Sequence, residues 1–104
     1  MSPKTVIIAI DTVTFAKALA DETRQKIMAL CCCNEMSVSQ LVEATKVAQP
    51  TVSHHLKILK EAGLVTADRR GKEIFYTLNQ AKLAKGCCQV AENFAPEVTL
   101  KIEI

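Results

Sequence analysis

The hydrophobic period of this chain changes at Gly63, and that change most constrains the fold. Before Gly63, apolar residues in the segment 49–62 recur at helical spacing. After it, residues 64–67 and 73–78 are rich in β-branched, aromatic and other apolar residues, which favours two strands. The charged, glycine-containing segment 68–72 joins them and indicates a hairpin. The sequence therefore predicts a mainly α fold with a small β-hairpin.

Residues with a preference for helix caps divide the rest of the chain into further helices. Acidic caps predict a first helix over residues 11–20 and a second one that begins after Asp21. Ser37, with Gln40 three residues later, has the capping-box pattern and predicts a short third helix. A last helix is expected over residues 80–95, with an apolar stripe along one face.

The two ends of the chain have strand-like patterns. Residues 4–10 are rich in β-branched side chains, and apolar and polar residues alternate over 96–104. Short terminal strands that pair with each other are therefore a possible addition to the fold. With 104 residues, 49% of them hydrophobic, the chain is expected to form a single domain over residues 1–104.

Residues 37–78 form the unit from which a function can be predicted. A short helix, a three-residue turn, a longer helix and a charged hairpin describe a winged helix-turn-helix, whose second helix enters the major groove of DNA. The polar residues expected to point outward from that second helix and to read bases are Gln49, Thr51, Ser53, His54 and Lys57. Lys57, and further basic residues at the turn and in the wing, are expected to contact phosphates or the minor groove; the further residues are Lys46, Arg69, Arg70 and Lys72.

Three segments carry a resemblance to a known family. They are ALADETRQKI from Ala18, QPTVSHHLKILKEAGLV from Gln49, and RGK followed by FYTL from Arg70. Together they resemble the ArsR/SmtB-type repressors, an arsenic- and metal-responsive winged-helix family, over about residues 13–95. The chain departs from the family at Ala48, where a capping serine is usual, and this loss weakens the helix cap by about 1 kcal/mol.

The resemblance implies a repressor that acts as a homodimer on double-stranded DNA. The first and last helices, 11–20 and 80–95, would form the dimer interface. The operator would be palindromic because two identical subunits read two half-sites. An inducer would then release the protein from its operator.

Two sensor sites of that family are absent from the sequence. The thiolate site before the third helix needs two cysteines, but the chain has Ser37 and Ser39 in that region, and hydroxyls are poor ligands for soft metals. The zinc site on the last helix needs histidine, and the chain has none after His55.

The five cysteines are the remaining sensor candidates: Cys31, Cys32, Cys33, Cys87 and Cys88. One hypothesis is that Cys87 and Cys88, with a thiol from the triplet, bind trivalent arsenic, As(III), or a similar soft ion as inducer. A second is a redox or persulfide switch that bridges the second and last helices, and a third is a regulator that senses nothing. As isolated residues, these cysteines can also be small buried hydrophobes.

Other functions find less support in the sequence. No nucleophile has a visible base partner, there is no phosphate-binding glycine loop and no required cofactor is indicated, so we expect no enzyme. Cysteines without a secretory signal predict reduced thiols and a cytoplasmic protein. No segment is long and apolar enough to predict a membrane partner.

Overall fold

Helices and a small sheet make up residues 11–99, the part of the chain that the computed structural model describes. In chain order the elements are α1 (Thr12–Leu19), α2 (Glu22–Cys31), β1 (Met36–Ser37), α3 (Val38–Thr45), α4 (Gln49–Glu61), β2 (Val65–Arg70), β3 (Glu73–Leu78), α5 (Gln80–Phe94) and α6 (Pro96–Thr99). This order confirms the predicted winged helix-turn-helix.

The predicted caps begin the helices. The Asp11 side chain accepts hydrogen bonds from two backbone N–H groups in the first turn of α1, and Asp21 accepts one at the start of α2. At α3, the Ser37 hydroxyl accepts from the Gln40 N–H at 3.2 Å, and the Gln40 side chain accepts from the Ser37 N–H at 2.9 Å. Each cap satisfies donors that the helix itself cannot pair.

The sheet is larger than the predicted hairpin. Its strand order is β1-β3-β2, because Met36 and Ser37 pair antiparallel with Tyr76 and Phe75. Strand β2 also runs on to Arg70, so the connection is shorter than the predicted one. The loop is Gly71 and Lys72, and Gly71 has a φ of +63°, which a type II′ turn requires at its first position.

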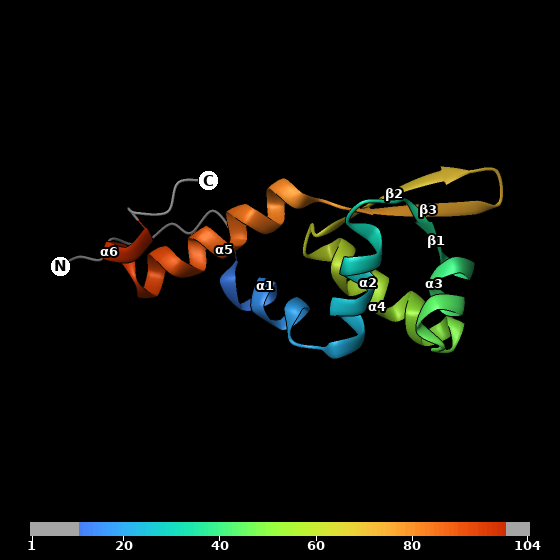
Figure 1. The fold of residues 1–104 in the computed structure, drawn as a ribbon, viewed down its shortest axis with the longest axis horizontal. Coiled ribbons are helices and arrows are strands. Elements are labelled where there is room, and N and C mark those ends of the chain that lie inside the picture. The colour runs from blue at the N-terminus through green and yellow to red at the C-terminus, as the bar shows by residue number, and fades with distance from the viewer. Residues whose placement is uncertain (1–10, 100–104) are drawn as a thin grey trace.

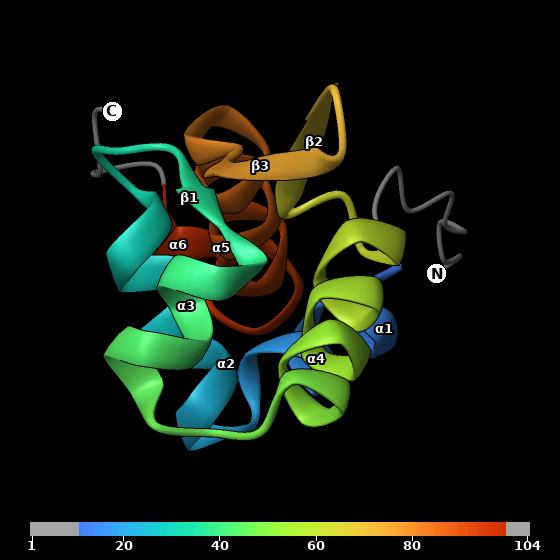
Figure 2. The ribbon, with the colours of Figure 1, turned by 90° about the vertical axis from the view of Figure 1, so that its right-hand side faces the viewer.

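The molecule separates into two ends. Figures 1 and 2 show α3, α4 and the hairpin together at one end, while α1 and the greater part of α5 lie at the other. Buried apolar side chains from α1, α2, α3, α4 and β2 join the two ends in one core. Its largest fully buried members are Ile27, Leu41, Leu56, Leu59, Leu64, Val52 and Cys31.

The predicted C-terminal strand is wrong for residues 96–99, the part of it that the structure describes. Pro96–Thr99 forms the short helix α6, where a proline is tolerated in the first turn. The rest of the predicted terminal strands, residues 1–10 and 100–104, lies outside the described residues. Among the described residues, no helix is both long and apolar enough to cross a bilayer.

Helix α5 passes close to α1 at Gly86. This residue is buried, and a Cβ added to it would stand only 2.2 Å from Cε1 of the Phe15 ring. Phe15 itself is 3% exposed, so its ring has little room to move away. Glycine at position 86 therefore sets the distance between the two helices.

We expect Gly86→Ala to destabilise the protein, although the same change in an open helix would stabilise it by about 1 kcal/mol. The free energy of unfolding from urea denaturation measures the effect. In a Phe15→Ala background the ring is gone, and the cost of Gly86→Ala should disappear. A Gly86→Ala protein as stable as the parent would contradict the close approach.

Candidate nucleic-acid interface

Helix α4 presents one buried and one exposed face. Val52, His55, Leu56 and Leu59 are buried. The predicted base-reading residues are all exposed: Gln49, Thr51, Ser53, His54 and Lys57. The apolar spacing of the sequence thus placed both faces correctly, and the polar face is free to meet a ligand.

Part of this face borders a hollow of about 320 Å³ between three elements. Ser37 and Ser39 line it from the start of α3, Gln49 and Ser53 from α4, and Lys72 from the hairpin. The structure therefore brings residues predicted to contact bases and a wing residue predicted to contact phosphate to one surface.

The other side chains predicted to contact phosphates differ in whether they already have partners within the protein. Lys46 is exposed and lies 3.3 Å from Glu43 at the end of α3, and it adopts a left-handed backbone with a φ of +61°. Arg69 is exposed and donates weakly to the carbonyl of Gly71 at 3.4 Å. These side chains can exchange such surface contacts for a phosphate because exposed ion pairs stabilise a protein little.

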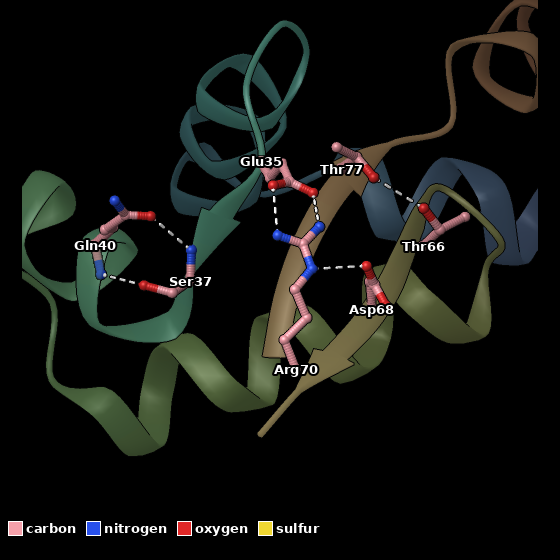
Figure 3. A network of polar contacts seen from close by, with 7 residues as sticks. All are labelled: Glu35, Ser37, Gln40, Thr66, Asp68, Arg70 and Thr77. Atoms are coloured by element: carbon pink, nitrogen blue, oxygen red, sulfur yellow. Dashed lines mark hydrogen bonds and ion pairs between the residues drawn. The ribbon is translucent and has the colours of Figure 1, made fainter. Parts of the chain in front are cut away.

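The guanidinium of Arg70 is held by contacts with other residues of the protein. Its Nε donates to Asp68 at 2.9 Å, and its two terminal nitrogens donate to the two carboxylate oxygens of Glu35 (Figure 3). The guanidinium also lies 4.7 Å from the centre of the Phe75 ring. The carboxylate of Glu35 is the main cause that raises the pKa of Arg70. Arg70 thus links the wing to the segment that follows α2, which the sequence did not reveal.

A second link, also missed from the sequence, holds α4 to the helices behind it. Arg24 of α2 donates to the carbonyls of Lys17 and Ala18, at 3.0 and 2.8 Å, near the C-terminal end of α1. Its remaining terminal nitrogen contacts Nδ1 of His55 at 2.9 Å. The Arg24 guanidinium therefore pairs two carbonyls near the C-terminal end of α1 and also contacts a buried side chain of α4.

The contact with Arg24 determines which ring nitrogen of His55 carries the proton. Because arginine has no acceptor, Nδ1 of His55 accepts the hydrogen bond and the proton of the neutral ring lies on Nε2. Nε2 faces Asp21, with 3.8 Å between it and a carboxylate oxygen. Burial lowers the pKa of His55, the Asp21 charge opposes this shift, and Arg24 and His54 add to it. His55 is thus a buried polar residue that packs between the helices.

The cysteines occupy three different environments. Cys31 is fully buried in the core, while Cys32 is half-buried and Cys33 exposed. Cys87 lines a groove of about 440 Å³ with Phe15, Leu19 and Val90, and Cys88 is half-buried beside it. Within residues 11–99, no three His, Cys, Asp or Glu side chains are placed to hold one metal ion.

Comparison with known proteins identifies a family for this arrangement. The family model described as "Bacterial regulatory protein, arsR family" matches residues 21–67. This match covers α2 to the beginning of β2 and therefore includes the whole helix-turn-helix.

Individual relatives extend the similarity. The chain is 39% identical over 67 residues to the transcriptional repressor SdpR of Bacillus subtilis, covering 64% of this chain and 74% of that protein. It is 40% identical over 70 residues to an arsenical resistance operon repressor of Staphylococcus aureus, covering 67% of each. Among solved structures, an ArsR-like transcriptional regulator from Rhodococcus sp. RHA1 has a TM-score of 0.73 at 29% identity, covering 86% of this chain and 84% of that one.

The lowered pKa of His55 predicts a pH-dependent stability. The folded chain binds the proton less readily than the unfolded chain, whose histidines titrate near about 6.5. The contribution of neutral His55 to the free energy of unfolding is therefore complete above that pH, and it is lost as the pH falls below it. Urea midpoints at pH 7.5 and 5.5 should show this loss, and His55→Gln should reduce it.

The matched control is His54→Gln, which changes the exposed neighbour on the same helix. Because the charge of His54 is the smallest of the causes that lower the pKa of His55, this change should leave most of the pH dependence in place. A His55→Gln protein that loses as much stability between the two pH values as the parent would refute the assignment.

Proposed function

Because this chain belongs to the ArsR family of bacterial regulatory proteins, we propose that it is a DNA-binding transcriptional repressor that binds a palindromic operator as a homodimer. An inducer that reacts with thiols, such as As(III), then releases it. The relatives and the family are transcriptional regulators, which confirms the expectation that the chain is not an enzyme.

The observation that carries this proposal is the common surface of α4 and the hairpin. Helix α4 has 13 residues and is therefore about 20 Å long, with its polar side exposed. An α-helix of this kind fits the major groove, where base edges present distinct donors and acceptors. The hairpin stands beside it at the same end of the molecule (Figure 2).

The residues divide into two roles on DNA. Near the beginning of α4, Gln49, Thr51, Ser53 and His54 carry both hydrogen-bond donors and acceptors, which suits them to read bases. Lys46, Lys57, Arg69 and Lys72 supply charge for phosphates. We assign Arg70 to positioning the wing, because its guanidinium already binds Glu35 and Asp68.

The opposite end of the molecule supports a dimer. The groove beside Cys87 is lined mainly by apolar side chains of α1 and α5. Val13 on α1 and Phe94 on α5 are large apolar residues that are 60% and 80% exposed. A two-fold contact through these helices buries them and places two copies of α4 to read two half-sites.

Thiols remain the proposed sensor groups. A site of three protein ligands is not assembled within the described part of one subunit, so an inducer would use two thiols or ligands from both subunits. The candidates are Cys31, Cys32, Cys33, Cys87 and Cys88. The similarity to the arsenical resistance operon repressor of Staphylococcus aureus supports a trivalent arsenic inducer.

Replacing Lys57 by alanine should weaken binding to duplex DNA and reduce the salt dependence. Loss of one phosphate contact lowers the slope of log affinity against log salt concentration by about 0.9. Fluorescence anisotropy between low and moderate salt measures this slope. Lys26→Ala removes the same charge from α2, where Lys26 pairs with Glu22, and should leave the slope unchanged. Equal slopes for Lys57→Ala and the parent would contradict the assigned contact.

Replacing Val13 by glutamate should convert the dimer into monomers. A charge buried without a partner costs several kcal/mol, so the dimer dissociation constant should rise by roughly 100-fold or more. Sedimentation equilibrium measures it. As a control, Ala44→Glu places the same charge on the exposed side of α3 and should leave the dimer intact. If the Val13→Glu protein stays dimeric at the same concentrations as the parent protein, this interface is wrong.

A further inference from the structure

The turn that follows α2 carries two thiols in contact with each other. The Sγ atoms of Cys32 and Cys33 are 3.2 Å apart, and both thiols are free. Cys33 is exposed and Cys32 is half-buried, so a small reagent can reach the pair from solvent. Cys31 points into the core and is fully buried.

The separation of these sulfurs indicates which ions they suit. For metal–sulfur bonds of about 2.3 Å, a tetrahedral angle places two sulfurs about 3.8 Å apart, and a right angle places them about 3.3 Å apart. The 3.2 Å between Cys32 and Cys33 is close to the second value. The pair therefore fits a three-coordinate pyramidal centre better than a tetrahedral one, and soft centres of this kind prefer sulfur.

We propose that Cys32 and Cys33 form a two-thiol site for trivalent arsenic or a similar pyramidal ion, and that its occupation acts on the wing through Glu35 and Arg70. The proposal rests on the proposed function, which gives the site its effect on DNA binding. It differs from the prediction that Cys87 and Cys88 are the principal ligands.

The binding step needs no oxidant. Arsenous acid, As(OH)₃, reacts with the two thiols; two As–S bonds form, two As–O bonds break, and two water molecules leave with the thiol protons. The third position on arsenic keeps its hydroxide. Cys31 is enclosed in the hydrophobic core, so its thiol does not serve as a third ligand.

The turn is connected to the elements on both sides. The carbonyl of Cys32 accepts a hydrogen bond at 2.8 Å from the side chain of Gln80, the first residue of α5. Two residues after Cys33, Glu35 binds Arg70 of the wing (Figure 3). An ion that bridges Cys32 and Cys33 restrains the backbone between these two contacts and therefore changes how Glu35 holds the wing.

The alternative pair, Cys87 and Cys88, lies on α5, one of the two helices assigned to the dimer interface. Cys87 also lines the groove assigned to the dimer interface, which would cover it in the assembled protein.

The experiment measures arsenic binding on the free full-length protein and DNA binding separately. Native mass spectrometry after addition of sodium arsenite should show one arsenic per subunit, with two fewer titratable thiols. The affinity for a duplex selected with the parent protein should fall by roughly 5- to 150-fold. Cys32→Ser/Cys33→Ser should lose the arsenic, whereas the matched Cys87→Ser/Cys88→Ser protein should keep it.

Three results would overturn the site: arsenic retained by Cys32→Ser/Cys33→Ser, arsenic lost from Cys87→Ser/Cys88→Ser, or loss of two hydrogens in place of a gain of arsenic. The single variant Cys33→Ser, at the exposed position, repeats the test should the double variant fold poorly. If the parent binds no DNA, the proposed function fails, but the mass measurement still decides the site.

The link to the wing has its own variant. Glu35→Gln removes the carboxylate charge that holds Arg70 and should still bind one arsenic per subunit. Arsenite should then change its DNA affinity much less than it changes that of the parent. An arsenite effect as large as in the parent would overturn the route through Glu35.

Discussion

The pairing of two residues, Met36 and Ser37, with strand β3 holds the hairpin and the helix-turn-helix, the two parts proposed to bind DNA, together. Ser37 is buried, pairs with Phe75 of β3 and caps α3 with its hydroxyl. Helix α3 therefore begins on the edge of the sheet, and α4 packs against α3. Because one residue serves both structures, the hairpin cannot turn relative to the helix-turn-helix without loss of the cap or of the strand pairing.

The contact between Arg24 and His55 extends this rigidity to the other end. It joins the C-terminal end of α1, the beginning of α2 and the buried face of α4. In a two-fold dimer formed through α1 and α5, the distance between the two copies of α4 depends on this junction. Half-site spacing on DNA is set by that distance. Under the proposed function, this polar link would therefore contribute to operator choice although it lies away from the proposed DNA-binding surface.

Local signals predicted most of the fold, whereas long-range contacts were missed. The caps at Asp11, Asp21 and Ser37 and the change of period at Gly63 located the helices and the two wing strands. Strand β1 has two residues, too few to show a period, and its partner is 40 positions away for Met36 and 38 for Ser37. The exposed face of α4 was predicted because burial follows helical spacing. The partner of Arg70 was not, since nothing in the sequence near Glu35 indicates a contact 35 residues later.

The fit of the Phe15 ring over Gly86 has a consequence for how this sequence can diverge. Neither position can change freely, because any side chain at 86 needs a smaller residue at 15, and a smaller residue at 15 leaves a void that glycine cannot fill. Substitutions at the two sites should therefore arise as linked pairs during evolution. Positions 15 and 86 are 71 residues apart, so such covariation would record the packing of the first helix on the fifth across a lineage of descendants.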